Sequence, residues 1–300
     1  MQYLSMSNMN RKIEAFILTH GRSDKVKTDK ALRKSGFTGR IRYIVDSLDS
    51  HIDNYRRKYG DDVVVFSKHS VSDITDTFDT SIDMRGVVYA RNACDKIAKE
   101  VGASHYFMLD DDYSRFGHVF DSNGKYRGGG LMVQNLDSIL GACADALDQS
   151  NITSIAFAQG GDFIGGEQGK AARFAAQKKY GRKIMNTFFI KTGRPIKFLG
   201  RINEDVNAYV CNPNYGDVYL TNYAIRVTQE VTQKSSGGMT TLYTDGGTYK
   251  KSMYSVVCAP SCVSVSAMGD RYKRMHHRVS WKNAVPLILN ETGEKVVDIC

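Results

Sequence analysis

The chain has 300 residues, of which 42% are hydrophobic and 24% charged, which is enough to bury a sizeable core and excludes a largely disordered protein. Residues 1–12 are polar and lack the apolar segment of a signal peptide, and no run approaches the roughly 20 apolar residues that cross a bilayer. We therefore expect one compact unit that stays in the cytoplasm and has no contact with a membrane.

Short apolar runs alternate with amphipathic segments along most of the chain, and this alternation predicts a parallel sheet built from βαβ units. The expected strands are residues 13–19, 40–45, 63–66, 105–109, 116–120, 125–127, 152–157, 184–190 and 261–266. The expected helices are residues 24–35, 49–59, a part of 82–101, 134–149, a segment ending at 180, a short segment after 204, and 249–258. Beyond residue 215 the pattern is less regular.

Three consecutive carboxylates, Asp110, Asp111 and Asp112, directly follow an expected buried strand. Open α/β sheets bind their ligands outside the carboxyl ends of the strands. Adjacent ionised carboxylates repel each other, and a divalent cation bound by Asp110 and Asp112 would supply the missing counter-charge, since Mg²⁺ and Mn²⁺ prefer hard oxygen ligands. Taken alone, the same residues also fit an acidic loop that caps the next element.

Basic and acidic residues elsewhere are expected to converge on the same edge. Arg22 follows the first strand, and Arg85 and Arg91 precede the strand that ends in the aspartates, so these arginines can neutralise a nucleotide diphosphate. Glu204 and Asp205 open a short helix, where one of them can act as a general base toward an acceptor hydroxyl. Each of these residues taken singly also fits a surface ion pair or a helix cap.

Two basic features lie further along the chain. His276 and His277 belong to a basic segment, where one imidazole can complete a metal shell or both can simply lie at the surface. Residues 170–201 contain ten Lys and Arg and no Asp or Glu, against a net charge of +9 for the whole chain. Such a segment with interleaved aromatic residues suits a nucleic-acid backbone, although a solvated helix followed by a buried strand fits equally. The DNA-binding candidates in this segment are Lys178, Lys179, Arg182, Lys183 and Arg201.

In their order and spacing, these motifs resemble the GT-A fold of nucleotide-sugar glycosyltransferases. The matching residues are Leu18 to Arg22, Arg85 to Asn92, Asp110 to Asp112, Gly160 to Asp162, Glu204-Asp205 and His276-His277. More narrowly, Arg85-Gly86, Asp110 to Tyr113 and the ending His276 to Trp281 resemble the TET-associated glycosyltransferases of bacteriophages, which are thought to decorate hydroxymethylated pyrimidines in phage DNA.

The resemblance implies an α/β fold in which a Rossmann-related mixed sheet is flanked by helices and followed by an irregular C-terminal part. It implies an N-terminal arm over residues 1–12, a glycosyltransferase domain over 13–282 and a C-terminal extension over 283–300. Within the domain, residues 13–120 would form the half that binds the nucleotide sugar, and residues 121–282 the half that binds the acceptor.

The resemblance also implies partners and roles. The donor would be a UDP-sugar held with Mn²⁺ or Mg²⁺, and the acceptor 5-hydroxymethylcytosine or a related base in double-stranded DNA. Asp110 and Asp112 would hold the metal, assisted by His276 or His277. The nucleotide sugar would also contact Thr19, Arg22, Arg85, Arg91 and Asp111. Asp205, paired with Glu204, would deprotonate the acceptor if transfer inverts the anomeric centre, and would position the acceptor if transfer retains it.

Three alternatives remain open at the level of sequence. A glycosyltransferase acting on a glycan or a protein would use the same donor site, with the basic segment serving solubility. A sugar nucleotidyltransferase also uses paired aspartates and a metal, but His20-Gly21-Arg22 is a poor version of its glycine-rich loop. A DNA-binding protein without enzymatic activity would have no use for a carboxylate cluster, which repels phosphate.

Overall fold

The computed structural model describes residues 11–80, 82–163, 165–181, 185–229, 240–268, 274–284, 289–291 and 294–296. Its strands are β1 (Ile13–Leu18), β2 (Ile41–Asp46), β3 (Val63–Phe66), β4 (His105–Asp110), β5 (Tyr113–Phe120), β6 (Tyr126–Met132), β7 (Ile152–Gln159), β8 (Tyr180–Gly181), β9 (Phe188–Lys191), β10 (Val218–Gln229), β11 (Val263–Met268), β12 (Arg274–Val279), β13 (Leu289–Glu291) and β14 (Glu294–Val296). Its α-helices are α1 (Thr28–Lys34), α2 (Ile52–Tyr59), α3 (Val88–Glu100), α4 (Leu136–Asp148), α5 (Lys170–Ala176), α6 (Glu204–Cys211) and α7 (Thr240–Cys258).

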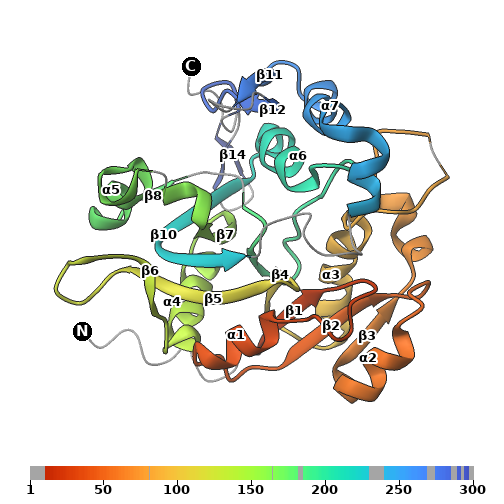
Figure 1. Cartoon of the computed structure of the whole chain (residues 1–300), viewed down its shortest axis with the longest axis horizontal. Helices are drawn as coiled ribbons and strands as arrows, with labels where there is room; N and C mark the ends of the chain where they lie inside the picture. Colours follow the sequence, from red (N-terminus) through yellow and green to blue (C-terminus); the bar gives the residue numbers. More distant parts are fainter. Residues whose placement is uncertain are drawn as a thin grey trace.

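One large mixed sheet runs through the molecule and carries helices on both of its faces (Figure 1). Its strand order is β3-β2-β1-β4-β9-β7-β10-β5-β6, with β8 paired to β10. The predicted parallel pairing is confirmed for β3, β2, β1 and β4. Beyond β4 the pairing changes, because β9 is antiparallel to both of its neighbours and β5 is antiparallel to β10. The mixed α/β fold expected from the sequence is thus confirmed.

These pairings bring several strand ends to one edge of the sheet. Since β10 is parallel to β7, and β9 is antiparallel to both β7 and β4, the carboxyl ends of β1, β2, β4, β7 and β10 share this edge. The amino ends of β5 and β9 lie at the same edge. Segments that are far apart in the sequence therefore meet where α/β sheets bind ligands.

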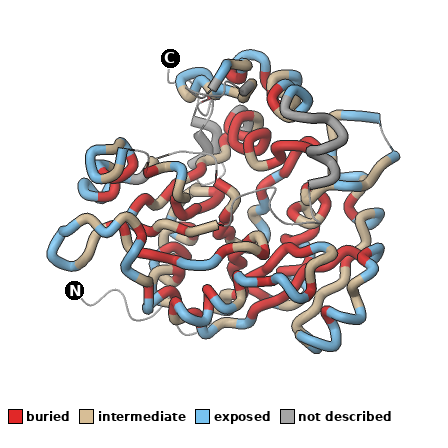
Figure 2. The backbone as a smooth tube through the Cα atoms, in the orientation of Figure 1, coloured by how far each residue is buried: buried red, intermediate tan, exposed pale blue. Residues whose placement is uncertain are grey.

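The core has two layers, one on each face of the sheet. Ala15 and Ile17 of β1 pack with side chains of α1, α2 and α4, whereas Phe16 and Leu18 pack with side chains of α3 and α6. Because both faces are covered, residues 15–18 of β1 are apolar in succession and do not alternate with polar residues. Figure 2 shows the corresponding buried tube through the middle of the molecule. No helix in the described ranges combines the length and the hydropathy needed to span a bilayer.

Two predicted helices are shorter in the structure, for local reasons. The helix expected from residue 24 begins at Thr28, because the main-chain N–H groups of Lys27 and Thr28 lie 2.9 and 3.4 Å from the carbonyl oxygen of Asp111 and tie the preceding turn to the aspartates. The helix expected to reach residue 180 ends at Ala176, and Lys178 then adopts a left-handed conformation with φ of 52°.

The stretch beyond residue 215 is more regular than its sequence indicates. It contains β10, a strand whose side chains alternate in burial and which lies between β7 and β5. The helix expected over 249–258 is the C-terminal half of the longer α7. The strand expected over 184–190 is β9, which begins at Phe188, and residue 184 lies outside the described ranges.

Candidate active site

A cavity of about 610 Å³ opens along the sheet edge where these strand ends meet. It gathers side chains from both halves of the chain, and it includes every residue that the sequence predicted to bind the nucleotide sugar or metal or to act in catalysis. These residues are Thr19, Arg22, Arg85, Arg91, Asp110, Asp111, Asp112, Glu204, Asp205, His276 and His277. A separate cavity of about 720 Å³, at the C-terminal ends of α6 and α7, contains none of them.

Asp111 is held at the β1 side of the cavity. The hydroxyl of Thr19 donates to Asp111 Oδ2 at 2.7 Å, and Arg22 Nη1 lies 3.2 Å from Asp111 Oδ1. The phenol oxygen of Tyr55 lies 2.8 Å from the Thr19 hydroxyl and accepts the main-chain N–H of Arg22 at 2.9 Å. Both oxygens of Asp111 are thereby engaged, and the turn after β1 is fixed to the aspartates.

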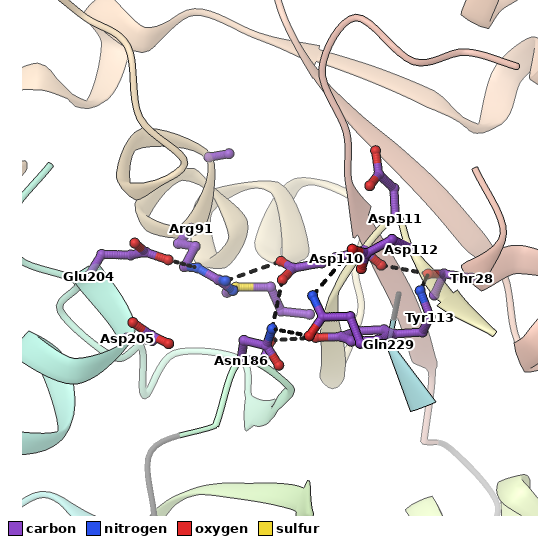
Figure 3. Close-up of polar contacts among 12 residues, drawn as sticks. Thr28, Arg91, Asp110, Asp111, Asp112, Tyr113, Asn186, Glu204, Asp205 and Gln229 are labelled. Atoms are coloured by element: carbon purple, nitrogen blue, oxygen red, sulfur yellow. Dashed lines mark hydrogen bonds and ion pairs between the residues drawn. The ribbon is translucent and has the colours of Figure 1, made fainter. Parts of the chain in front are cut away.

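Asp110 shares one buried arginine with α6 (Figure 3). Arg91 Nη2 lies 3.1 Å from Asp110 Oδ1, and Arg91 Nε lies 2.9 Å from Glu204 Oε1. The guanidinium carbon lies 5.1 Å from the ring centre of Phe188 and 5.6 Å from that of Phe198. Arg91 therefore connects the aspartates at the end of β4 to the first turn of α6.

Of the three consecutive aspartates, Asp112 has the least protein compensation. Its Oδ1 atom is buried and has no hydrogen-bond partner among the described residues, while Oδ2 accepts from Gln229 Nε2 at 3.3 Å. Burial, together with the charges of Asp110 and Asp111, raises the pKa of Asp112 to about 7. A buried oxygen beside two further carboxylates is a place where a cation would be stabilised.

The two carboxylates of α6 differ in their surroundings. Glu204 is buried against Arg91, and its burial raises its pKa to about 7 although Arg91 opposes the shift. Asp205 is half-buried and lines the cavity, and its Oδ1 accepts the main-chain N–H of Val206 at 2.8 Å. Asp205 is therefore the α6 carboxylate that faces the cavity without a protein cation bound to it among the described residues.

The two histidines lie on β12 and reach the same cavity. Their ring centres are 4.3 Å apart, and His276 Nδ1 lies 2.6 Å from the main-chain oxygen of His277. Burial, and secondarily the neighbouring His276, lowers the pKa of His277 to about 4, so its imidazole is neutral at pH 7. Within the described ranges, no three His, Cys, Asp or Glu side chains are close enough together to enclose a metal ion.

Within the described residues, the side chains of the predicted basic segment differ in exposure. Lys178 and Lys179 are exposed just after α5, as a DNA-binding role requires. Arg201 is only 3% exposed, and its guanidinium binds both oxygens of Asp79 at 3.0 Å. The expectation that Arg201 lies on a DNA-binding surface is therefore wrong, because this side chain is occupied within the fold. Arg182 and Lys183 lie outside the described residues.

Sequence reasoning missed several polar residues of the cavity, most of them at strand ends. Asp46, Gln159 and Gln229 are the last residues of β2, β7 and β10, and Asn186 lies just before β9. Lys68, which follows β3, places its Nζ 2.7 Å from Asp46 Oδ2. Their position directly beside a strand end is the signal that identifies them, but it can be used only once the strand order is known.

Comparison with known proteins gives a family. The model of the TET-Associated Glycosyltransferase family matches residues 13–238. No curated protein sequence matches the chain.

Three solved structures are similar at low identity. Glucosyl-3-phosphoglycerate synthase from Mycobacterium tuberculosis, in complex with Mg²⁺ and uridine diphosphate, has a TM-score of 0.45 and 8% identity, with 93% of this chain and 91% of that chain covered. The same enzyme with Mn²⁺, uridine diphosphate and phosphoglyceric acid has a TM-score of 0.44 and 8% identity, with 93% and 90% covered. A mycobacterial protein has a TM-score of 0.43 and 9% identity, with 93% and 87% covered. The assignment rests on the family model: this chain belongs to the TET-associated glycosyltransferase family and is a glycosyltransferase.

Proposed function

We propose that the chain transfers a sugar from a UDP-sugar, held with Mn²⁺ or Mg²⁺, to 5-hydroxymethylcytosine or a related hydroxymethylpyrimidine in double-stranded phage DNA. The observation that carries the metal-assisted transfer is Asp112, whose buried Oδ1 lacks a hydrogen-bond partner among the described residues. An unpaired buried carboxylate oxygen is costly unless it is protonated or bound to a cation. The raised pKa of Asp112, about 7, expresses this cost.

The residues present fit a divalent cation bound together with substrate. Asp112 and Asp110 would hold it, and His277, neutral at pH 7, is available as a further ligand. Mg²⁺ is commonly bound by one or two carboxylates and by substrate phosphates, so a closed cage of protein ligands is not required. When bound, the cation would stabilise the negative charge that develops on the departing diphosphate.

The β1 side of the cavity suits the nucleotide diphosphate. Arg22 lies there beside Asp111, and Lys68 beside Asp46. Arg85, at the exposed rim, pairs with Asp83 at 2.7 Å in this structure and is long enough to turn toward a phosphate. These cations would orient the diphosphate through charge-assisted hydrogen bonds.

Asp205 is the better placed base for an inverting transfer. Glu204 is buried and bound to Arg91, whereas Asp205 opens onto the cavity. The hydroxymethyl oxygen of the acceptor would attack the anomeric carbon as its bond to the diphosphate oxygen breaks, and Asp205 would accept the hydroxyl proton. In a retaining transfer, the same carboxylate would orient the acceptor hydroxyl.

DNA as the acceptor is supported by charge and by family membership. The chain carries a net charge of +9, and Lys178 and Lys179 present exposed cations beyond α5. Lysines that contact phosphate oxygens supply affinity that does not depend on base sequence. The family itself is named for its association with TET proteins.

A single assay tests donor, metal and acceptor. The protein is incubated with Mn²⁺, a panel of UDP-sugars and DNA containing 5-hydroxymethylcytosine. The DNA is then digested to nucleosides, and their masses are measured by mass spectrometry. We expect one sugar to add its mass to the modified nucleoside and expect Asp112→Asn to abolish the gain. The matched control is Asp53→Asn, an exposed aspartate of α2, which should retain activity.

Each failure has its own meaning. Full turnover by Asp112→Asn would contradict the metal assignment. Release of UDP from a UDP-sugar without any gain of mass on DNA would support the assignment of the donor and refute the assignment of DNA as the acceptor.

A further inference from the structure

Three uncharged carboxamides form one hydrogen-bonded cluster beside Asp110 and Asp112. Gln159 Nε2 donates to Asn186 Oδ1 and, at 3.3 Å, to Gln229 Oε1. Asn186 Nδ2 donates to the same Gln229 oxygen at 3.1 Å. The three residues come from the end of β7, the segment before β9 and the end of β10, and all of them line the cavity. We call Gln159, Asn186 and Gln229 the amide cluster.

The amide cluster is fixed to the two aspartates that are proposed to hold the cation. Asn186 Nδ2 also donates to Asp110 Oδ2 at 3.0 Å, and Gln229 Nε2 donates to Asp112 Oδ2 at 3.3 Å (Figure 3). Gln159 contacts neither aspartate through its side chain and instead braces the other two amides. The amides are therefore held in defined orientations before any ligand arrives.

The strand order places this cluster beyond the diphosphate. Along β2-β1-β4-β9-β7-β10, the groups proposed for the nucleotide lie at β1 and β2, and the aspartates lie at β4. The amide cluster follows at β9, β7 and β10. Neighbouring strands are about 5 Å apart, so β7 lies roughly 10 Å beyond β4, which leaves room for one sugar ring past the phosphates.

The chemistry of the cluster suits hydroxyl groups. After the hydrogen bonds within the cluster and to the aspartates are counted, two side-chain groups have no partner among the described residues. These are the amide oxygen Oε1 of Gln159 and one of the two Nε2–H groups of Gln229. A sugar hydroxyl both donates and accepts, so it can bond to such a pair, whereas a phosphate would call for cations. A site with fixed polar groups rejects analogues that leave those groups unpaired.

We propose that the amide cluster of Gln159, Asn186 and Gln229 recognises the hydroxyl groups of the transferred sugar and sets which UDP-sugar is used. This inference rests on the proposed function, because it needs the donor to be a UDP-sugar. Within the amide cluster, Gln159 is the residue that determines specificity, because its side chain would bind the sugar hydroxyls without contacting Asp110 or Asp112.

Calorimetric titration of the full chain with Mn²⁺ and either UDP or a UDP-sugar separates the sugar from the nucleotide. The measured quantity is the ratio of the affinity for the UDP-sugar to that for UDP, determined for UDP-glucose, UDP-galactose and UDP-xylose. We expect Gln159→Met, which keeps the volume of the side chain, to lower this ratio for the preferred sugar by roughly 3- to 10-fold, the value of one hydrogen bond. The affinity of the variant for UDP itself should stay within about twofold of the affinity that the unaltered chain has for UDP.

Two further variants keep the test decisive. Gln159→Ala repeats the removal with a smaller side chain in case the methionine variant does not fold. Gln149→Met changes an exposed glutamine at the end of α4, outside the cavity, and should leave every ratio unchanged.

The outcomes are distinct. A ratio that is unchanged in both Gln159 variants, or affinities for UDP and UDP-sugar that fall by the same factor, overturns the role of the amide cluster and leaves the proposed function standing. If the unaltered chain binds no UDP at all, the proposed function fails, and this inference fails with it.

Discussion

Replacing Arg91 by methionine would remove the positive charge that the buried Glu204 shares with the half-buried Asp110. The guanidinium is 3% exposed, lies 2.9 Å from Glu204 and 3.1 Å from Asp110, and is covered by the rings of Phe188 and Phe198. Methionine fills much of the same space, so the loss is mainly electrostatic. Breaking a buried ion pair by removal of one partner costs about 3–5 kcal/mol, and we expect a loss of that order in the free energy of unfolding.

The loss should grow with pH. Burial raises the pKa of Asp110 and Glu204, the latter to about 7, and Arg91 holds both values down. Without Arg91 the pKa values rise further, so the folded variant keeps protons that the unfolded chain, with a glutamate pKa of about 4.3, has already released. Where the folded state binds more protons than the unfolded state, stability falls as pH rises. In the unaltered chain, the free energy of unfolding that protonated Glu204 contributes should be lost between about pH 4 and 7. The methionine variant should continue to lose stability above pH 7.

Urea denaturation at pH 5.5 and pH 8.5, in the presence of a chelator, measures the effect. The difference between Arg91→Met and the unaltered chain should be larger at pH 8.5. Arg40→Met is the control, because Arg40 pairs with Asp62 at 2.7 Å where both side chains are more than 40% exposed, at 46% and 42%. That pair should contribute no more than about 1 kcal/mol. If Arg91→Met costs no more than the control, or costs the same at both pH values, the electrostatic reasoning is refuted.

Two other predictions concern the DNA-binding surface and the backbone. Replacing Lys178 and Lys179 by alanine should reduce the slope of log affinity for DNA against log salt concentration by about 2, measured by fluorescence anisotropy, and an unchanged slope would remove both lysines from the DNA contact. Gly200 has φ of +82°, and a Cβ atom there would lie 2.3 Å from Asn207 Nδ2, whereas at Gly60, with φ of +56°, nothing lies within 4 Å. Alanine at Gly200 should therefore destabilise the protein by clearly more than the roughly 1–3 kcal/mol expected at Gly60 from its positive φ alone, and equal shifts of the urea midpoint would contradict the clash.

The fold was predictable where short apolar strands alternate with helices along the chain and pair with one another. β1, β2, β3 and β4 are short apolar runs, and their pairing is parallel as the alternation with helices indicates. β10 was not predicted, because its strand mixes apolar with polar residues, among them Thr221, which is fully buried. Its insertion between β7 and β5, which both precede it in the chain, is a long-range pairing that local periodicity does not encode.

The composition of the site was more predictable than its contacts. The rule that ligands bind at the carboxyl ends of strands accounts for the aspartates after β4 and for Arg22 after β1, whereas the histidines, which also line the cavity, lie within β12 of a separate two-stranded sheet. That rule could not predict which partner each charged side chain binds. Arg201 counted as a surface cation in the sequence, yet Asp79 binds it inside the fold. Arg91 was assigned to the nucleotide, and the structure gives its guanidinium two protein carboxylates.

The contacts of Arg91 explain why the motif at β4 and the motif at α6 should be treated as one electrostatic unit. A cation bound at Asp110 would offset the negative charge of Asp110, which raises the pKa of Glu204 across the shared Arg91. That change lowers the proton affinity of Glu204 and, through its charge, affects the adjacent Asp205, which opens onto the cavity. Arg91 thus links the aspartates that we propose to hold the cation with the helix that carries the proposed base, a connection that neither motif reveals when it is read alone.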